Sequence, residues 1–281
     1  MKLLRYGPAG HEKPAIMDSD GKIRDLSAHV SDIDGNSLGD AELKKIAALD
    51  LAGLPEVSAS ERLGPCVGSV GKLVCIGLNY SDHAEESGLD VPPEPVLFFK
   101  ATSSICGAND SIEVPRESTA LDWEVELAIV IGKDGKYIEE ADAPNHIAGY
   151  CVVNDVSERD FQINRSGQWV KGKSADTFGP VGPWMVTKDE IPDPQKLSMY
   201  LEVNGESRQK GNTSTMVYQV NFLVAYVSKF MSLQAGDIIS TGTPPGVGMG
   251  MKPPQYLKAG DIVTLGIEGL GDQRQEVVAP T

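Results

Sequence analysis

The sequence predicts a mixed α+β fold in which β-strands dominate. A single long segment, 213–233, has apolar residues at the three-four spacing of a helix, and Gly236 follows it. Residues 197–210 predict a hairpin, because Asn204 and Gly205 form a favoured two-residue turn between two strand-like runs. Further short runs rich in β-branched and aromatic residues predict strands at 72–77, 96–100, 122–131 and 147–154.

The chain predicts two domains of unequal size. Residues 2–27 have the pattern of short strands joined by turns, and residues 39–50 predict a helix. Residues 51–70 contain the glycine, proline and serine that are typical of a linker. We therefore expect a small N-terminal domain over residues 1–68 and a larger domain over residues 69–281.

The composition argues against several classes of partner. The chain has 281 residues, of which 41% are hydrophobic, and its formal net charge is −15. This acidity disfavours nucleic acid and anionic membranes as partners, and no apolar run is long enough for a signal peptide or a membrane span. The cysteines lack C-x-x-C spacing, which favours buried thiols in a reduced, cytoplasmic protein over a zinc site. They are Cys66, Cys75, Cys106 and Cys151.

The strand expected over 122–131 contains alternating acidic residues. Side chains alternate across a strand, so Asp122, Glu124 and Glu126 lie on one face, followed there by apolar positions. A half-buried row of carboxylates is unfavourable unless a cation offsets the repulsion. Oxygen ligands suit magnesium, manganese or calcium. The alternative is the solvated polar face of an edge strand, and this stretch alone does not decide between the two.

A third carboxylate follows the nearly all-apolar strand expected over 147–154. Asp155 would complete a metal site begun by Glu124 and Glu126. The alternative is a helix N-cap, since Glu158 lies three residues further on, as in a capping box.

A histidine and a glutamate share one face of a short predicted helix. His83 and Glu86 are three residues apart, so the carboxylate can orient the imidazole and raise its basicity, as deprotonation of water requires. The alternative is an exposed pair on a surface helix. Downstream, the polar loop 165–180 contains Lys173, although a lysine in such a loop is usually solvated. The glycine-rich segment 242–250 lacks a following helix, which excludes a dinucleotide site but allows backbone amides to face an anion.

Five motifs in order resemble the fumarylacetoacetate hydrolase family over roughly residues 70–270. Each motif alone is weak, but the ordered set is specific. The N-terminal residues 24–27 resemble bacterial members that act on sugar-acid breakdown products. The motifs are Cys75 to His83, Glu124-x-Glu126, Asn154-Asp155-x-Ser157-x-Arg159-Asp160-x-Gln162, Lys171-Gly172-Lys173-Ser174-x-Asp176-Thr177 and Ser240-Thr241-Gly242-Thr243-Pro244.

The resemblance implies a fold, a partner and a set of site residues. The resemblance implies a β-roll or sandwich with a small N-terminal domain, and we expect a homodimer or a dimer-based oligomer. The resemblance assigns Glu124, Glu126 and Asp155 as ligands of Mg²⁺, Mn²⁺ or Ca²⁺. The catalytic residues would be His83, Glu86 and Lys173, and the substrate contacts Tyr80, Arg159, Gln162 and Thr243.

The implied function is metal-dependent hydrolysis of a C–C bond in a 2,4-diketo acid, an acylpyruvate. The bacterial members that the chain resembles act on 2,4-diketo-3-deoxy-L-rhamnonate or -fuconate and give pyruvate plus lactate. Two alternatives stay open. One is an oxaloacetate-type decarboxylase or an isomerase of the same family, and the other is a small-molecule binding protein with a degenerate site.

Overall fold

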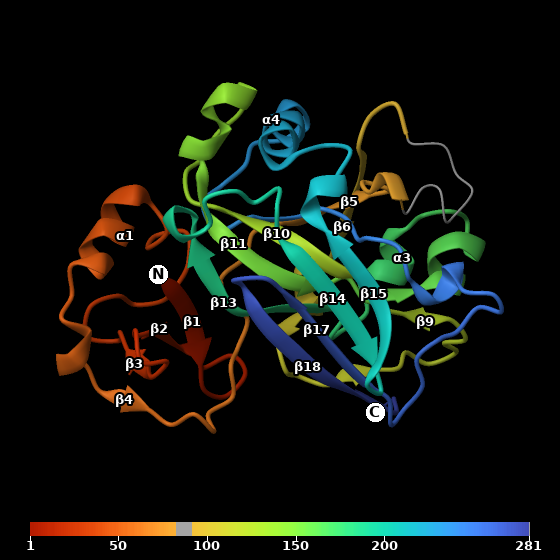
Figure 1. Ribbon diagram of the computed structural model, residues 1–281, viewed down its shortest axis with the longest axis horizontal. Helices are drawn as coiled ribbons and strands as arrows, with labels where there is room; N and C mark the ends of the chain where they lie inside the picture. The colour runs from red at the N-terminus through yellow and green to blue at the C-terminus, as the bar shows by residue number, and fades with distance from the viewer. Residues whose placement is uncertain (83–91, 281) are drawn as a thin grey trace.

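The computed structural model describes residues 1–82 and 92–280, and it confirms a mixed α+β fold composed mostly of strands (Figure 1). Its largest sheet has eleven strands. In sheet order these are β4 (Glu56–Val57), β3 (Ile23–Asp25), β2 (Lys13–Met17), β1 (Lys2–Tyr6), β13 (Gly179–Thr187), β11 (Ile147–Asn154), β10 (Val125–Ile131), β16 (Ile238–Ser240), β5 (Leu73–Gly77) and β6 (Val96–Lys100), with β7 (Ile105–Gly107) parallel to β13.

A second sheet packs against the first and makes a sandwich. Figure 1 shows β14, β15, β17 and β18 in front of β10 and β11. Leu127 of β10, Leu201 of β14 and Leu265 of β17 are fully buried in one apolar cluster between the sheets. The second sheet has the order β15 (Glu206–Asn212), β14 (Ser198–Val203), β17 (Ile262–Ile267), β18 (Gly271–Val278) and β8 (Ile112–Glu113), and β9 (Leu121–Asp122) pairs separately with β12 (Ser157–Glu158).

The helices whose two ends lie within residues 1–82 and 92–280 are short. The predicted helix at 39–50 is α1 (Asp40–Ala47), and α3 (Val170–Lys173) is a single turn. One π-helical turn, η4 (Asp160–Asn164), precedes it. Further helical turns in the described part of the chain are η1 (Leu51–Gly53), η2 (Thr102–Ser104), η3 (Glu140–Asn145), η5 (Lys188–Glu190), η6 (Thr213–Thr215) and η7 (Gly248–Gly250).

The long predicted helix begins later than its apolar spacing indicates. Helix α4 (Val220–Phe230) starts seven residues after 213, because the backbone of residues 217–218 forms hydrogen bonds outside the helix. Their backbone N–H groups donate to the carbonyl oxygen and Oδ1 of Asn79, both at 2.8 Å. These bonds hold the segment extended against Asn79 and Tyr80 and prevent a helical turn there.

The N-terminal region continues the large sheet. Strand β1 pairs with β13, and Leu3 and Ile16 pack in one buried cluster with Val130 and Ile238. Residues 1–68 therefore share a core with the remainder of the chain, and the domain boundary near residue 68 stays a prediction. The cysteines are free thiols, and none of the helices in 1–82 and 92–280 is long and apolar enough to cross a membrane.

Candidate active site

The acidic strand is central, and it is interrupted. Strand β10 lies between β11 and β16 and is buried at every position, which excludes the solvated face of an edge strand. The strand expected over 122–131 breaks after Asp122 and resumes at Val125. In the break, the backbone N–H of Glu124 donates to Oδ1 of Asn154, and its carbonyl accepts from the N–H of Asp155. These bonds bring the end of β11 beside the start of β10.

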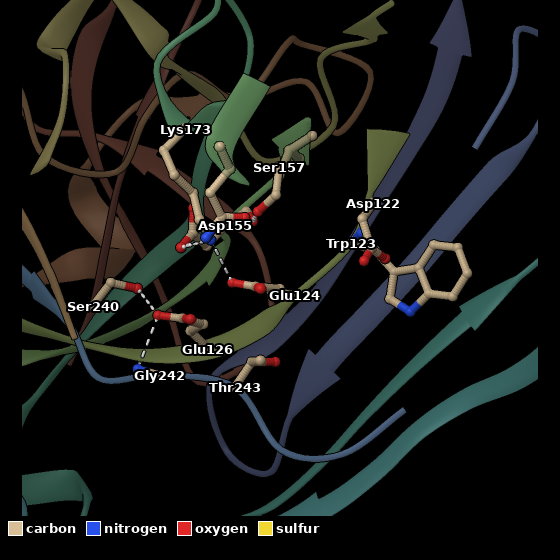
Figure 2. A network of polar contacts seen from close by, with 12 residues as sticks. Asp122, Trp123, Glu124, Glu126, Asp155, Ser157, Lys173, Ser240, Gly242 and Thr243 are labelled. Atoms are coloured by element: carbon tan, nitrogen blue, oxygen red, sulfur yellow. Dashed lines mark hydrogen bonds and ion pairs between the residues drawn. The ribbon is translucent and has the colours of Figure 1, made fainter. Parts of the chain in front are cut away.

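Three carboxylates meet at this point (Figure 2). Glu124 precedes β10, Glu126 belongs to it, and Asp155 follows β11. All three are buried, and one oxygen of each lies within 4.8 Å of an oxygen of the others. The side chain of Asp155 caps no helix, because β12 follows and its two oxygens face ammonium groups.

Two buried lysines balance part of this charge. Lys173 Nζ contacts Glu124 Oε2 at 2.8 Å and Asp155 Oδ2 at 2.7 Å, as Figure 2 shows. Lys100 Nζ contacts Asp155 Oδ1 at 2.5 Å from the end of β6. Burial favours the neutral amine of Lys173, but the charges of Asp155 and Glu124 outweigh it and raise the pKa of this lysine above its usual value.

Arg159 connects the triad to the glycine-rich loop. Its Nη2 contacts Glu124 Oε1 at 2.6 Å, its Nε contacts Asp122 Oδ2 at 2.8 Å, and its Nη1 donates to Gln162 Oε1 at 3.0 Å. Asp122 also accepts backbone N–H bonds from Gly248 and Met249 at 2.7 and 3.0 Å. Asp122 therefore orients Arg159 and lies outside the triad. The backbone amides of the glycine-rich loop face the carboxylate of Asp122.

Glu126 differs from the other two acids in its partners. Its Oε2 accepts from the Ser240 hydroxyl at 2.5 Å and the Gly242 N–H at 3.0 Å (Figure 2). Among the described residues, no lysine or arginine forms an ion pair with it. Burial and then the charges of Asp155 and Glu124 raise its pKa well above the usual range. The pKa of Glu124 falls to about 2, because Lys173 and Arg159 overcome the effect of its burial.

The donor set fits a hard divalent cation. The buried group comprises four carboxylates and three cationic side chains, so its net charge is −1 with all of them ionised. A divalent cation beside Glu126 would relieve the repulsion and bring the net charge to +1. Carboxylate oxygens are the ligands that magnesium, manganese and calcium prefer. The four acids are Asp122, Glu124, Glu126 and Asp155, and the three cations are Lys100, Arg159 and Lys173.

A cavity of about 150 Å³ opens on this cluster. Glu124, Glu126, Arg159, Gln162, Lys173 and Thr243 line its polar part. The Thr243 hydroxyl donates to the Val125 carbonyl at 2.9 Å and accepts from the Gln209 side chain. Strands β10 and β15, which contain these two residues, therefore hold the hydroxyl in place.

The other predicted residues lie elsewhere. The structure does not place Tyr80 in the cavity lining, because its ring is fully buried and its hydroxyl donates to Met199 Sδ at 3.3 Å. His83 and Glu86 lie outside the described residues.

Sequence reasoning missed three contributors to the site. Lys100 ends an ordinary apolar strand, and nothing local distinguishes it from a solvated lysine. Ser240 and Gly242 lie in a motif used for the family resemblance, but their contact with Glu126 depends on the pairing of β16 with β10. Gly242 has φ +96°, a conformation that favours glycine and places its N–H beside Glu126.

Comparison with known proteins establishes the family. Residues 72–278 match the model of the fumarylacetoacetate (FAA) hydrolase C-terminal family. This chain belongs to the fumarylacetoacetate hydrolase family of enzymes. A Burkholderia multivorans protein named “Putative hydrolase” is 63% identical over 276 residues, 98% of each chain.

Two solved structures of the family share the whole fold. The fumarylacetoacetate hydrolase of psychrophilic Exiguobacterium antarcticum is 38% identical, with a TM-score of 0.87 over 99% of both chains. The maleylpyruvate hydrolase of Sphingobium sp. SYK-6 is 28% identical, with a TM-score of 0.83 over 100% of both chains, and was solved with manganese(II) and pyruvate. This likeness confirms the predicted β-sandwich.

Proposed function

We propose that this protein is a metal-dependent hydrolase that cleaves the C–C bond of a 2,4-diketo acid, an acylpyruvate, into pyruvate and a carboxylic acid. The observation that carries the proposal is a cavity lined by Glu124 and Glu126 of a buried carboxylate triad, with Lys173 in contact with two members of that triad. The names of the Burkholderia and Sphingobium relatives support hydrolysis and pyruvate chemistry. The substrate to test first is 2,4-diketo-3-deoxy-L-rhamnonate, which is the same compound as 2,4-diketo-3-deoxy-L-fuconate because C5 is its single stereocentre, and which would yield pyruvate and lactate.

Glu124, Glu126 and Asp155 would hold the cation, which we propose to be magnesium, manganese or calcium. When bound, it supplies Lewis acidity that polarises the 2-oxo group and offsets the charge of the substrate carboxylate. With the cation bound and all of its side chains ionised, the buried group would have a net charge of +1, which favours binding of an acid by such an acidic chain.

Polar residues of the cavity position the substrate. Arginine has no acceptor atom, so the bond from Arg159 fixes the carbonyl oxygen of the Gln162 amide toward it. The Gln162 NH₂ group is therefore the donor that can serve a substrate oxygen. Arg159 itself is held by Asp122 and Glu124 and adds positive charge to the wall.

The proposed reaction divides the chemistry between a base and an ammonium group. His83, oriented by Glu86, takes a proton from a water molecule as that water adds to the C4 carbonyl. The C3–C4 bond then breaks, and its electron pair enters the enolate of pyruvate. Lys173 stabilises the negative charge where it develops, and protonation at C3 gives pyruvate. The catalytic roles of His83 and Glu86 are inferred from the sequence motif alone.

The test is a steady-state assay of pyruvate release with Mg²⁺ or Mn²⁺, against a panel of acylpyruvates and 2,4-diketo-3-deoxy sugar acids. We expect pyruvate in stoichiometric amounts with the carboxylic acid, and loss of the reaction in EDTA. Carbon dioxide release from oxaloacetate, with no activity on the panel, would instead establish the decarboxylase alternative. Isomerisation of an unsaturated keto acid without C–C cleavage would establish an isomerase.

A further inference from the structure

A row of aromatic side chains in contact begins just before helix α4 and continues along it. The rings are those of Tyr218, Phe222, Tyr226 and Phe230, with adjacent centroids 5.2, 5.8 and 5.0 Å apart. The first ring stacks on the second at an angle of 20°. The Tyr218 hydroxyl donates a hydrogen bond of 2.6 Å to the carbonyl oxygen of Pro92. Stacking on the helix therefore orients a hydroxyl that reaches a segment 126 residues earlier in the chain.

The backbone of Tyr218 is held by the side chain of Asn79. The Oδ1 atom of Asn79 accepts from the Tyr218 N–H at 2.8 Å, and its Nδ2 atom donates to the Tyr218 carbonyl at 3.0 Å. Asn79 is fully buried, and its Nδ2 atom also donates to the carbonyl of Thr241 at 2.8 Å. The next residue, Gly242, donates its N–H to the proposed metal ligand Glu126. These bonds connect Tyr218 to the loop that holds Glu126.

Tyr218 therefore bonds to the chain on both sides of residues 83–91. Its backbone pairs with Asn79 before them, and its hydroxyl holds Pro92 directly after them. This stretch of the sequence contains His83, the predicted base. A chain segment with both ends fixed has fewer accessible conformations than one fixed at a single end, because loop closure removes conformational entropy. Loss of the bond to Pro92 would free one of the two ends.

We propose that Tyr218 is a positioning residue for His83, and that it acts through the hydrogen bond from its hydroxyl to the Pro92 carbonyl. The inference rests on the proposed function and adds to it a residue that does not line the cavity. A general base must lie within hydrogen-bond reach of the proton that it takes, and a misplacement of about 1 Å can cost about 10²-fold in rate. Holding both ends of the segment restricts where its base can lie relative to Glu126.

The first test is Tyr218→Phe, which removes one hydroxyl and keeps the ring. We expect kcat for C–C hydrolysis to fall by about 2- to 10-fold, the factor equivalent to one hydrogen bond, with KM and Mn²⁺ affinity unchanged. Tyr200→Phe is the matched control, because it removes a tyrosine hydroxyl that bonds to Asp272 at 2.9 Å on the second sheet. A wild-type kcat in Tyr218→Phe, or an equal fall in the control, would contradict the positioning role.

A double-mutant cycle separates positioning of His83 from a general structural effect. When Tyr218→Phe is added to His83→Ala, kcat should fall no further, because the position of an absent imidazole cannot affect the rate. A second fall as large as that in the single variant would overturn the inference and leave C–C hydrolysis established. Wild-type turnover by His83→Ala would overturn both the base and its positioning residue. Absence of pyruvate from the wild-type protein on the whole panel would overturn the proposed function, and this inference with it.

Discussion

Two clusters of charged side chains in this molecule differ in how their carboxylates are partnered. In the N-terminal cluster, Arg5 contacts Asp32 at 2.7 Å and Glu12 at 3.6 Å, while Arg62 contacts Glu12 at 2.9 Å and Asp110 at 2.6 Å. Every carboxylate of this cluster thus touches a guanidinium, and most of the side chains reach water. In the active-site cluster, all members are buried and Glu126 touches no cationic side chain among the described residues.

The difference shows which acidic cluster needs a further cation. Each cluster has one more carboxylate than it has cationic groups, so net charge alone does not distinguish them. Partial exposure lets water offset the charge in the first cluster, whereas burial prevents this in the second. The location of the carboxylate that lacks a cationic partner among the described residues therefore marks the functional cluster.

The largest effect is expected for Glu126→Gln, which removes a charge and keeps the shape. We expect loss of measurable Mn²⁺ binding in calorimetry and a fall in pyruvate release to the level of EDTA-treated protein, because a hard cation loses an anionic ligand. Asp110→Asn, in the N-terminal cluster, is the matched control and should keep both properties. Tight Mn²⁺ binding by Glu126→Gln would remove Glu126 from the ligand set.

The next effect concerns His83, the predicted base. His83→Ala should lower kcat for C–C hydrolysis by about 10²- to 10⁴-fold, the usual contribution of general base catalysis, with Mn²⁺ affinity unchanged. Kinetic assays and calorimetry on the same preparation measure the two quantities. Turnover at the wild-type rate would eliminate the assigned role.

A smaller loss of turnover is expected for Lys173→Met. Removing one group that stabilises developing negative charge costs about 10²- to 10³-fold in kcat. Cation binding should persist, because the carboxylates that Lys173 contacts lose a competing positive charge. Lys171→Met, an exposed residue of the same helical turn, should behave as wild type. Comparable kcat in the two variants would contradict the role of Lys173.

The smallest catalytic effect is expected in the N-terminal cluster. Arg62→Met should lower the free energy of unfolding by about 1–3 kcal/mol, since charged hydrogen bonds to Asp110 and Glu12 are lost. The kcat should stay the same. Lys22→Met breaks an exposed ion pair with Glu56 and should change stability by under about 1 kcal/mol. Denaturant unfolding measures the stability of both variants. A large loss of kcat in Arg62→Met would contradict the assignment of a purely structural role to the N-terminal cluster.

Local sequence pattern predicted the fold class and much of the site. The alternation of acidic and apolar residues identified the strand that contains Glu126, and a nearly all-apolar run identified the strand that precedes Asp155. The ordered motifs indicated Arg159 and Lys173. The pattern did not reveal Lys100 or the partners of Glu126, because they come from β6 and β16, which are distant in sequence and reach the site only through sheet pairing. The predicted start of α4 was also wrong. Backbone N–H groups that the apolar spacing assigned to a helix donate instead to Asn79.

The buried triad is proposed to hold a cation on which C–C hydrolysis depends. The most direct test is pyruvate release from a 2,4-diketo acid by EDTA-treated protein during titration with Mn²⁺. We predict that activity is absent at the start, rises with bound Mn²⁺ and reaches its plateau at one ion per chain. Full activity in the metal-free protein, with Mn²⁺ titration changing nothing, would contradict the claim.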